Sequence, residues 1–156
     1  PIRRCEGFCV VSAVTWLLDT NVVSEAIRPQ PNPAVMGSLK RYQGEMTIAA
    51  PVWHELRFGW LRLPEGQRRD AIGRFVQDVA GQLPVLPYDA SAARIHAELR
   101  SQRALAGQTL PFVDGQIAAI AIAHGVTLVT RNTKDFAGLQ GLRIVDWFQS
   151  DSFVDR

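Results

Sequence analysis

The chain has 156 residues, of which 47% are hydrophobic and 21% are charged, and its formal net charge is +2 at pH 7. That length suits one domain with a substantial core and excludes two, and the composition is that of an ordinary globular protein. The small net charge permits a polyanionic partner such as nucleic acid but does not require one. We find no internal repeat and no low-complexity tract.

The first residues allow two interpretations. Two arginines followed by the apolar run 8–18 resemble the basic and hydrophobic regions of a signal peptide. The run is too short to span a membrane, and it ends in Asp-Thr-Asn instead of a small-residue cleavage site. We therefore expect residues 1–13 to be an N-terminal extension that is disordered or foreign to the native chain. Cys5 and Cys9 lack a second Cys or His pair that would complete a zinc site, and a reduced, cytoplasmic protein is expected.

The first half of the chain alternates short apolar runs with helical patterns. A β-branched, apolar run stopped by Asp-Thr-Asn predicts the first strand, and a proline-rich run separates two short helices after it. Trp53 and Trp60 belong to an apolar stripe on the next helix, which indicates core or a dimer interface more than a surface for stacking bases. The elements are a strand at 14–18, helices at 22–27 and 34–42, a strand at 46–49, and a helix from Pro51 to the break at Pro64.

The second half continues the alternation. The helix that follows Pro111 is apolar on every face from Ile117 to Ala123, a pattern typical of a helix enclosed by the protein. Strands that are apolar throughout and alternate with helices predict an α/β fold with a parallel sheet covered on both faces. The elements are a helix at 65–80, a strand at 83–87, a helix at 91–106 ended by Gly107, a helix at 111–124, and strands at 126–130 and 143–145.

Four acidic residues lie just past apolar segments or in the first turns of helices: Asp19, Glu55, Asp114 and Asp135. Asp19 directly follows the first strand, where open parallel sheets form their sites, although it could also cap a helix. Asp114 precedes a buried helix, where a charge needs a partner. Glu55 could be a surface charge favoured by the helix dipole, and Asp135 with Asn132 resembles a capping box.

Carboxylates so far apart in the sequence can meet only if the fold gathers them at one edge of a sheet. Such a cluster would carry about four negative charges on oxygen ligands alone, a set that selects Mg²⁺ or Mn²⁺ over zinc. One such ion, or a pair roughly 3.5–4 Å apart, can activate water and stabilise the departing oxygen of a phosphodiester. The residues therefore predict metal-dependent phosphodiester hydrolysis.

Motifs spread over the chain resemble those of the PIN-domain nucleases, in the family's order and spacing and within Thr15 to Phe148. They are LLDTNVVSE at 17–25, PVWHEL at 51–56, FVDGQIAA at 112–119 and VTRNTKDF at 129–136. The run SEAIRPQPN at 24–32 further resembles the FitB-like members of the VapC toxin group. The resemblance implies a three-layer α/β/α sandwich around a parallel sheet, with a PIN domain at 14–150 and a C-terminal tail at 151–156.

The same resemblance assigns roles to the acidic residues. Asp19 and Asp114 would bind the metal most directly, and Glu55 would bind it or position the attacking water. Asp135 and Asn132 compete for the fourth metal-binding and catalytic place. Thr20 and Asn132 would hydrogen-bond the ligands from outside, which orients them.

Two hypotheses about function follow from the resemblance. The first is a Mg²⁺-dependent endoribonuclease, with Mn²⁺ as a substitute, which is the toxin of a VapBC-type toxin–antitoxin system. It would cut tRNA or other structured RNA, form homodimers, contact no membrane, be inhibited by a VapB/FitA-like antitoxin, and bind promoter DNA through that antitoxin. The second is a FitB-like regulatory module that acts mainly through the antitoxin and DNA, with weak or no nuclease activity.

Basic residues could supply a rim that contacts phosphates, with salt-dependent affinity and little choice of sequence. The alternative is that they form solvated helix faces. They are Arg57, Arg62, Arg68, Arg69, Arg74, Arg131 and Lys134.

Overall fold

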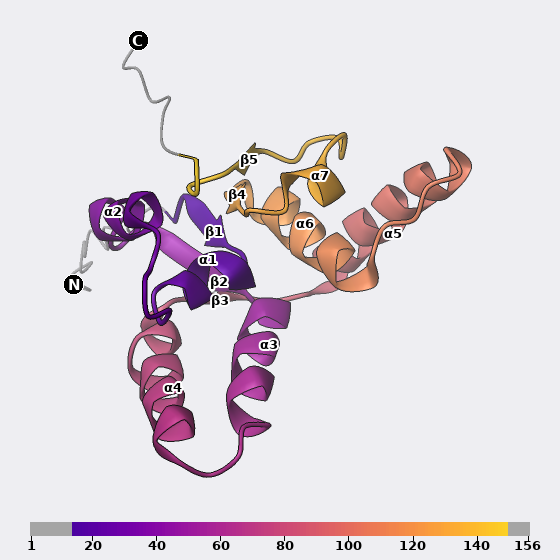
Figure 1. Cartoon of the computed structure of the whole chain (residues 1–156). Coiled ribbons are helices and arrows are strands. Elements are labelled where there is room, and N and C mark those ends of the chain that lie inside the picture. The colour runs from indigo at the N-terminus through magenta and orange to yellow at the C-terminus, as the bar shows by residue number, and fades with distance from the viewer. Residues whose placement is uncertain (1–13, 150–156) are drawn as a thin grey trace, which may run out of the picture.

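Within residues 14–149, the part of the chain that this computed structural model describes, five strands form one sheet in the order β3-β2-β1-β4-β5 (Figure 1). The predicted extension at 1–13, with its cysteines, and the predicted tail at 151–156 lie outside the described residues. The strands are β1 (Trp16–Leu18), β2 (Met46–Ala49), β3 (Val85–Leu86), β4 (Thr127–Val129) and β5 (Ile144–Val145).

All neighbouring strands run parallel, and β1 lies in the middle between β2 and β4. Leu17 and Leu18 of β1 are both buried, as are Ile48 of β2 and Leu128 of β4. A strand whose side chains are buried on both faces must be covered by helices on both sides. The predicted α/β sandwich with a parallel sheet is confirmed.

Strand β3 is shorter than the predicted strand at 83–87. Pro84 and Pro87 border it, and a proline has no N–H to donate to a strand ladder. Pro84 still contributes its carbonyl oxygen, which accepts from the backbone N–H of Ile48 at 3.0 Å and from the hydroxyl of Thr47 at 2.6 Å. The prolines therefore confine β3 to two ladder residues.

The predicted helices begin and end within a few residues of their predicted positions, and one further short helix, Thr133–Phe136, was not among the predicted elements. Helix α1 starts at Thr20, two residues before the predicted start at residue 22, because the Asp19 side chain accepts from the Thr20 N–H. The predicted helix at 65–80 ends earlier and is followed by one 3₁₀ turn, η1 (Ala80–Gln82). The helices are α1 (Thr20–Glu25), α2 (Pro33–Arg41), α3 (Ala50–Leu61), α4 (Gln67–Asp78), α5 (Ala90–Leu105), α6 (Phe112–His124) and α7 (Thr133–Phe136).

Helix α6 is the enclosed helix of the domain, as its apolar sequence predicts: residues 117–121 are all buried. It packs beside α5, whose His96 is buried against Gly115 so closely that a Cβ at Gly115 would overlap the imidazole. Gly125 ends α6 in the left-handed conformation, with φ of 64°. The packing against α5 holds the first turn of α6 in place, and Asp114 lies in that turn.

Helices α3 and α4 form a hairpin that extends from the sheet (Figure 1). Trp53 and Trp60 of α3 are partly buried against the core, and the Arg57 guanidinium lies over both rings at 5.5 and 5.4 Å from their centroids. Trp60 faces Gly73 of α4, where a Cβ would overlap the indole. The prediction that these tryptophans serve packing is confirmed.

Three aromatic rings meet around the first residue of β1. The rings of Trp16 and Tyr42 are 4.9 Å apart, those of Trp16 and Trp147 are 5.6 Å apart, and those of Tyr42 and Trp147 are 5.5 Å apart. We call this set the aromatic cluster. Trp147 is buried there, so the cluster ties the turn after β5 to the start of β1 and the end of α2.

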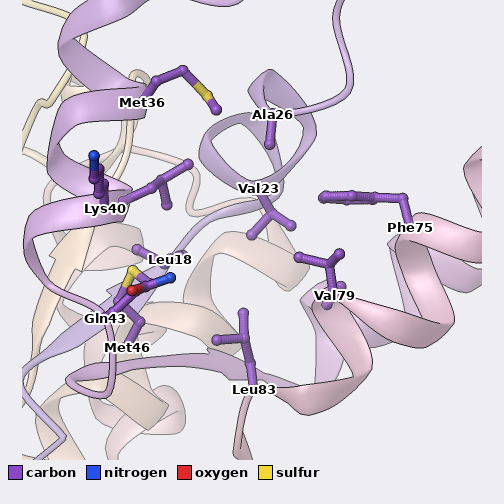
Figure 2. Close-up of a pocket in the computed structure, with 12 residues that line it drawn as sticks. Leu18, Val23, Ala26, Met36, Lys40, Gln43, Met46, Phe75, Val79 and Leu83 are labelled. Atoms are coloured by element: carbon purple, nitrogen blue, oxygen red, sulfur yellow. The ribbon is translucent and has the colours of Figure 1, made fainter.

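An apolar pocket opens between α1, α2 and α4 (Figure 2). Met36, Phe75 and Val79 are among the side chains that line it, and Val79 remains exposed. None of the four predicted acidic residues lines this pocket, so it is separate from the candidate active site. No helix in the described part of the chain combines the length and the apolar character needed to cross a membrane.

Candidate active site

Asp19 lies at the carboxyl end of β1, where the sheet edge and the start of α1 meet. It is only 8% exposed, and both carboxylate oxygens are hydrogen-bonded: Oδ1 accepts from the Thr20 N–H at 2.8 Å and Oδ2 from the Thr130 hydroxyl at 2.7 Å. The same carboxylate therefore caps α1 and faces the neighbouring strand end. The two roles predicted for Asp19 are compatible, because Oδ1 caps the helix and Oδ2 faces Thr130 at the end of the neighbouring strand.

Thr130 connects the ends of two strands. It follows β4 directly and is fully buried, and its hydroxyl donates to Asp19 while accepting from the Asn132 N–H at 3.0 Å. Asn21 strengthens the link, since its amide oxygen accepts from the Arg131 N–H at 3.3 Å. Sequence reasoning missed Thr130 and Asn21. Their positions in the sequence could have indicated them, because Thr130 is one residue and Asn21 three residues beyond the ends of adjacent parallel strands.

Glu55 lies on α3 and is joined to α1 by one hydrogen bond. The Thr20 hydroxyl donates to Glu55 Oε2 at 2.5 Å. Helix α3 begins immediately after β2, so Glu55 extends from the carboxyl end of the strand beside β1. Because its carboxylate is half-buried and held by a residue of another element, Glu55 is not an isolated surface charge.

Asp114 is half-buried in the first turn of α6, and its pKa is raised above the ordinary value. Burial is the largest cause, followed by the negative charges of Asp19, Asp135 and Glu55. Since all three act on Asp114, the fold gathers the four carboxylates in one region. We call them the carboxylate cluster.

The pKa of Asp19 is also raised, again mainly by burial. The hydrogen bonds from Thr130 and from the Thr20 N–H act in the opposite direction, and the charge of Glu55 adds to the increase. Asp19, which is buried, and Asp114, which is half-buried, are thus harder to ionise than free carboxyls, mainly because burial disfavours their charged forms.

Asp135 is exposed on α7, and Asn132 donates its side-chain amide to Asp135 Oδ2 at 2.5 Å. The capping-box interpretation is wrong, because the Asn132 side chain caps no backbone N–H of α7 and instead holds the carboxylate. The Arg103 guanidinium of α5 donates to the carbonyl oxygens of Asp135 and Ala137 at 3.4 and 2.8 Å. Helix α7 is therefore held in place by α5, although it has only four residues.

The donor set of the cluster fits a hard divalent cation, because it consists of carboxylate oxygens without His or Cys. The raised pKa of Asp114 supports this fit: burial raises it most, the neighbouring carboxylates add to it, and a cation would offset both effects. Within residues 14–149, however, no three His, Cys, Asp or Glu side chains converge closely enough to hold an ion as they stand. Mg²⁺ is commonly bound through one or two carboxylates and completes its coordination with water, so a full set of protein ligands is not required at this cluster.

Comparison with known proteins gives one family and close relatives. The family model for the PIN domain matches residues 16–142. The VapC ribonuclease Y4jK of Sinorhizobium fredii is 37% identical over 136 residues, which cover 83% of this chain and 95% of that protein. Toxin FitB of Neisseria gonorrhoeae is 37% identical over 131 residues, which cover 77% of this chain and 89% of FitB. A solved structure of FitAB bound to the IR36 DNA fragment has a TM-score of 0.80 at 30% identity and covers 89% of this chain and 99% of the matched one.

Proposed function

The chain belongs to the PIN-domain family, and on this premise we propose that it is a metal-dependent ribonuclease, the toxin of a VapBC-type toxin–antitoxin pair. The observation that carries the proposal is the carboxylate cluster, in which the charges of Asp19, Glu55 and Asp135 act on Asp114. The names of the relatives support RNA as the substrate, because the VapC ribonuclease covers most of this chain.

In this proposal Asp19 and Asp114 hold Mg²⁺ or Mn²⁺, and Glu55 and Asp135 complete the site. When bound, such an ion supplies activated water and stabilises the departing oxygen of the phosphodiester. Thr130 keeps Asp19 in one orientation through its hydroxyl, and Thr20 does the same for Glu55. The N-terminal turn of α6 contributes backbone N–H groups, which favour negative charge at Asp114.

We further propose that the protein acts in a complex with an antitoxin that contacts promoter DNA, and that it forms homodimers. Support comes from the related FitAB assembly, which is bound to DNA. The apolar pocket between α1, α2 and α4 supports a protein partner, because burying Met36, Phe75 and Val79 would remove apolar surface from water.

A second candidate is a regulatory module with weak or no nuclease activity. One finding favours it: the FitAB structure that resembles this chain, at 30% identity over 89% of it, is a complex bound to DNA. The two candidates differ in whether the isolated protein cuts RNA.

The deciding experiment uses the full chain, freed of any partner, with total RNA and purified tRNA. We expect cleavage with Mg²⁺ or Mn²⁺, none with EDTA, and a loss of activity by orders of magnitude in Asp19→Asn and Asp114→Asn. Asp78→Asn is the matched control, because Asp78 is an exposed aspartate at the end of α4. Intact RNA under all conditions, together with a DNA shift by the complex, would establish the regulatory module instead.

A further inference from the structure

Phe112 is an exposed aromatic residue at the N-terminus of α6, the helix that the domain encloses. It is the first residue of α6 and is 54% exposed, whereas residues 117–121 of the same helix are buried. The ring is nevertheless held on two sides. The His96 ring packs against it edge-on, with centroids 4.9 Å apart, and the Arg100 guanidinium lies 5.4 Å from its centroid.

The support beneath Phe112 is rigid. His96 is only 2% exposed, its Nδ1 is hydrogen-bonded with the Tyr88 hydroxyl at 2.9 Å, and it fits tightly over Gly115. Burial and the charge of Arg100 lower the pKa of His96, so the imidazole packs as a neutral ring. A surface ring fixed in this way can receive a stacking partner with little loss of conformational entropy.

Arg100 adds a positive charge that forms no salt bridge with any carboxylate of the described residues. In residues 14–149 the salt bridges are Arg28 with Glu25 and Arg94 with Glu98, and Arg100 belongs to neither. Its neighbour one turn along α5, Arg103, is committed to the carbonyl oxygens of α7. The guanidinium of Arg100 is therefore available beside an aromatic face.

Both members of the pair lie on helices that reach the carboxylate cluster. Phe112 and Asp114 share the first turn of α6, two residues apart, so their side chains leave the helix on different sides. On α5, Arg103 lies one turn from Arg100 and donates to the carbonyl oxygen of Asp135. A group bound at Phe112 would therefore lie close to the carboxylates without occupying their place.

We propose that Phe112 and Arg100 form a stacking platform for an unpaired nucleobase of RNA, adjacent to the phosphodiester at the carboxylate cluster. This inference rests on the proposed ribonuclease function and specifies its substrate: single-stranded or looped RNA with a base free to leave its stack. Aromatic rings and arginine planes are the groups on which proteins stack unpaired bases. The positive charge beside the ring favours RNA over an apolar protein contact, because RNA is a polyanion.

The test measures affinity for RNA in EDTA, which prevents metal-dependent cleavage, by fluorescence anisotropy of a short labelled single-stranded RNA. Phe112→Leu should weaken binding about 10-fold, and Phe112→Trp should retain it. Arg100→Gln, which leaves the ring in place, should weaken binding severalfold. The matched control is Phe58→Leu: Phe58 is 58% exposed and carries the Arg62 guanidinium 5.9 Å from its ring, but it lies on α3. It should bind as the unchanged protein does.

An oligomer of the same length without bases separates stacking from phosphate contacts. Phe112→Leu and the unchanged protein should bind this abasic oligomer equally. In cleavage assays Phe112→Leu should raise KM by the factor lost in affinity and leave kcat unchanged, because stacking acts equally on bound substrate and transition state. Thermal melting confirms that each variant is folded.

The proposed stacking platform is contradicted if Phe112→Leu binds RNA as tightly as the unchanged protein does. It is also contradicted if the variant loses as much affinity for the abasic oligomer as for RNA. It is also wrong if the variant keeps its RNA affinity but loses an antitoxin, which would make Phe112 a protein contact. Cleavage by the unchanged protein judges the proposed function separately. RNA binding through Phe112 without cleavage would support the platform and contradict the nuclease, whereas cleavage without any contribution of Phe112 to RNA binding would contradict the platform alone.

Discussion

Strand β1 begins in the aromatic cluster and ends in the carboxylate cluster, and the two regions have opposite energetic character. At its first residue, Trp16 packs with Tyr42 and Trp147 in a region stabilised by buried aromatic surface. Directly after its last residue, Asp19 is buried among groups that include the charge of Glu55, and its pKa is raised. One strand therefore joins a stabilising region to one whose charges oppose folding.

The contrast between the two regions shows that the fold keeps an energetically unfavourable group of charges at the candidate active site. The carboxylate cluster persists because other elements hold its members, as Thr130 holds Asp19 and Thr20 holds Glu55. Burial and, after it, the neighbouring negative charges raise the pKa of Asp114, so keeping that carboxylate ionised in the folded chain costs free energy. Substitutions in the two regions should therefore separate activity from stability.

The largest expected effect is on activity at the carboxylate cluster. Asp114→Asn should reduce RNA cleavage by at least about 100-fold, because the loss of a charged ligand removes several kcal/mol of transition-state stabilisation. The free energy of unfolding in EDTA should not fall, because the variant relieves repulsion. Cleavage rates and denaturant titrations on the same preparation test both statements. A variant that loses activity only because it unfolds would contradict the comparison.

At the aromatic cluster the effect should fall on stability. Trp147→Ala should lower the free energy of unfolding by about 3–5 kcal/mol, the usual cost of removing a large buried aromatic side chain. Trp147→Phe should cost less, because part of the ring contact remains. The cleavage rate per folded molecule should be unchanged. A specific loss of kcat in a folded Trp147→Phe would show that the two regions are coupled.

Thr130 should show a smaller effect on the site. Thr130→Val keeps the shape but removes the hydroxyl that donates to Asp19, and a loss of about 10- to 100-fold in activity or metal affinity is expected. Thr130→Ser retains the hydroxyl and should restore most of it. Isothermal titration with Mn²⁺ and cleavage rates provide the measurements. Equal activity of the Val and Ser variants would mean that Thr130 only fills space.

The smallest effect concerns pH and metal. Because the folded-state pKa values of Asp19 and Asp114 are raised, the folded protein binds more protons than the unfolded chain between the ordinary and the raised values. The stability that this contributes is present at acidic pH and is lost as the pH rises through the raised values. In EDTA at pH 7, Asp114→Asn should therefore raise Tm by a few degrees.

Added Mg²⁺ should raise the Tm of the unchanged protein and have less effect on Asp114→Asn, because the variant has lost a ligand. Melting curves at several pH values with and without Mg²⁺ test this. If both proteins had the same Tm across the pH range, the charge of Asp114 would have no effect on stability, and this explanation would be wrong.

Much of the architecture could be predicted from local pattern. Residues 46–49 form β2 as predicted, and the all-apolar segment in α6 is enclosed because no face of it suits water. The limits of β3 were harder to predict, because a ladder depends on which N–H and carbonyl groups a neighbouring strand presents. Thr47 and Ile48 both bond to the carbonyl of Pro84, a pairing that the local sequence does not show.

By itself, the sequence determined which residues could carry charge at the site and which segments had to be buried, since charge and hydrophobicity belong to each side chain. The tertiary structure decided what each group meets. Thr130 reaches Asp19 across 111 positions, and Asn132 holds the Asp135 carboxylate where a helix cap was predicted. The physical reason is that hydrogen bonding and charge repulsion depend on distance in space, and only the parallel sheet brings these strand ends together.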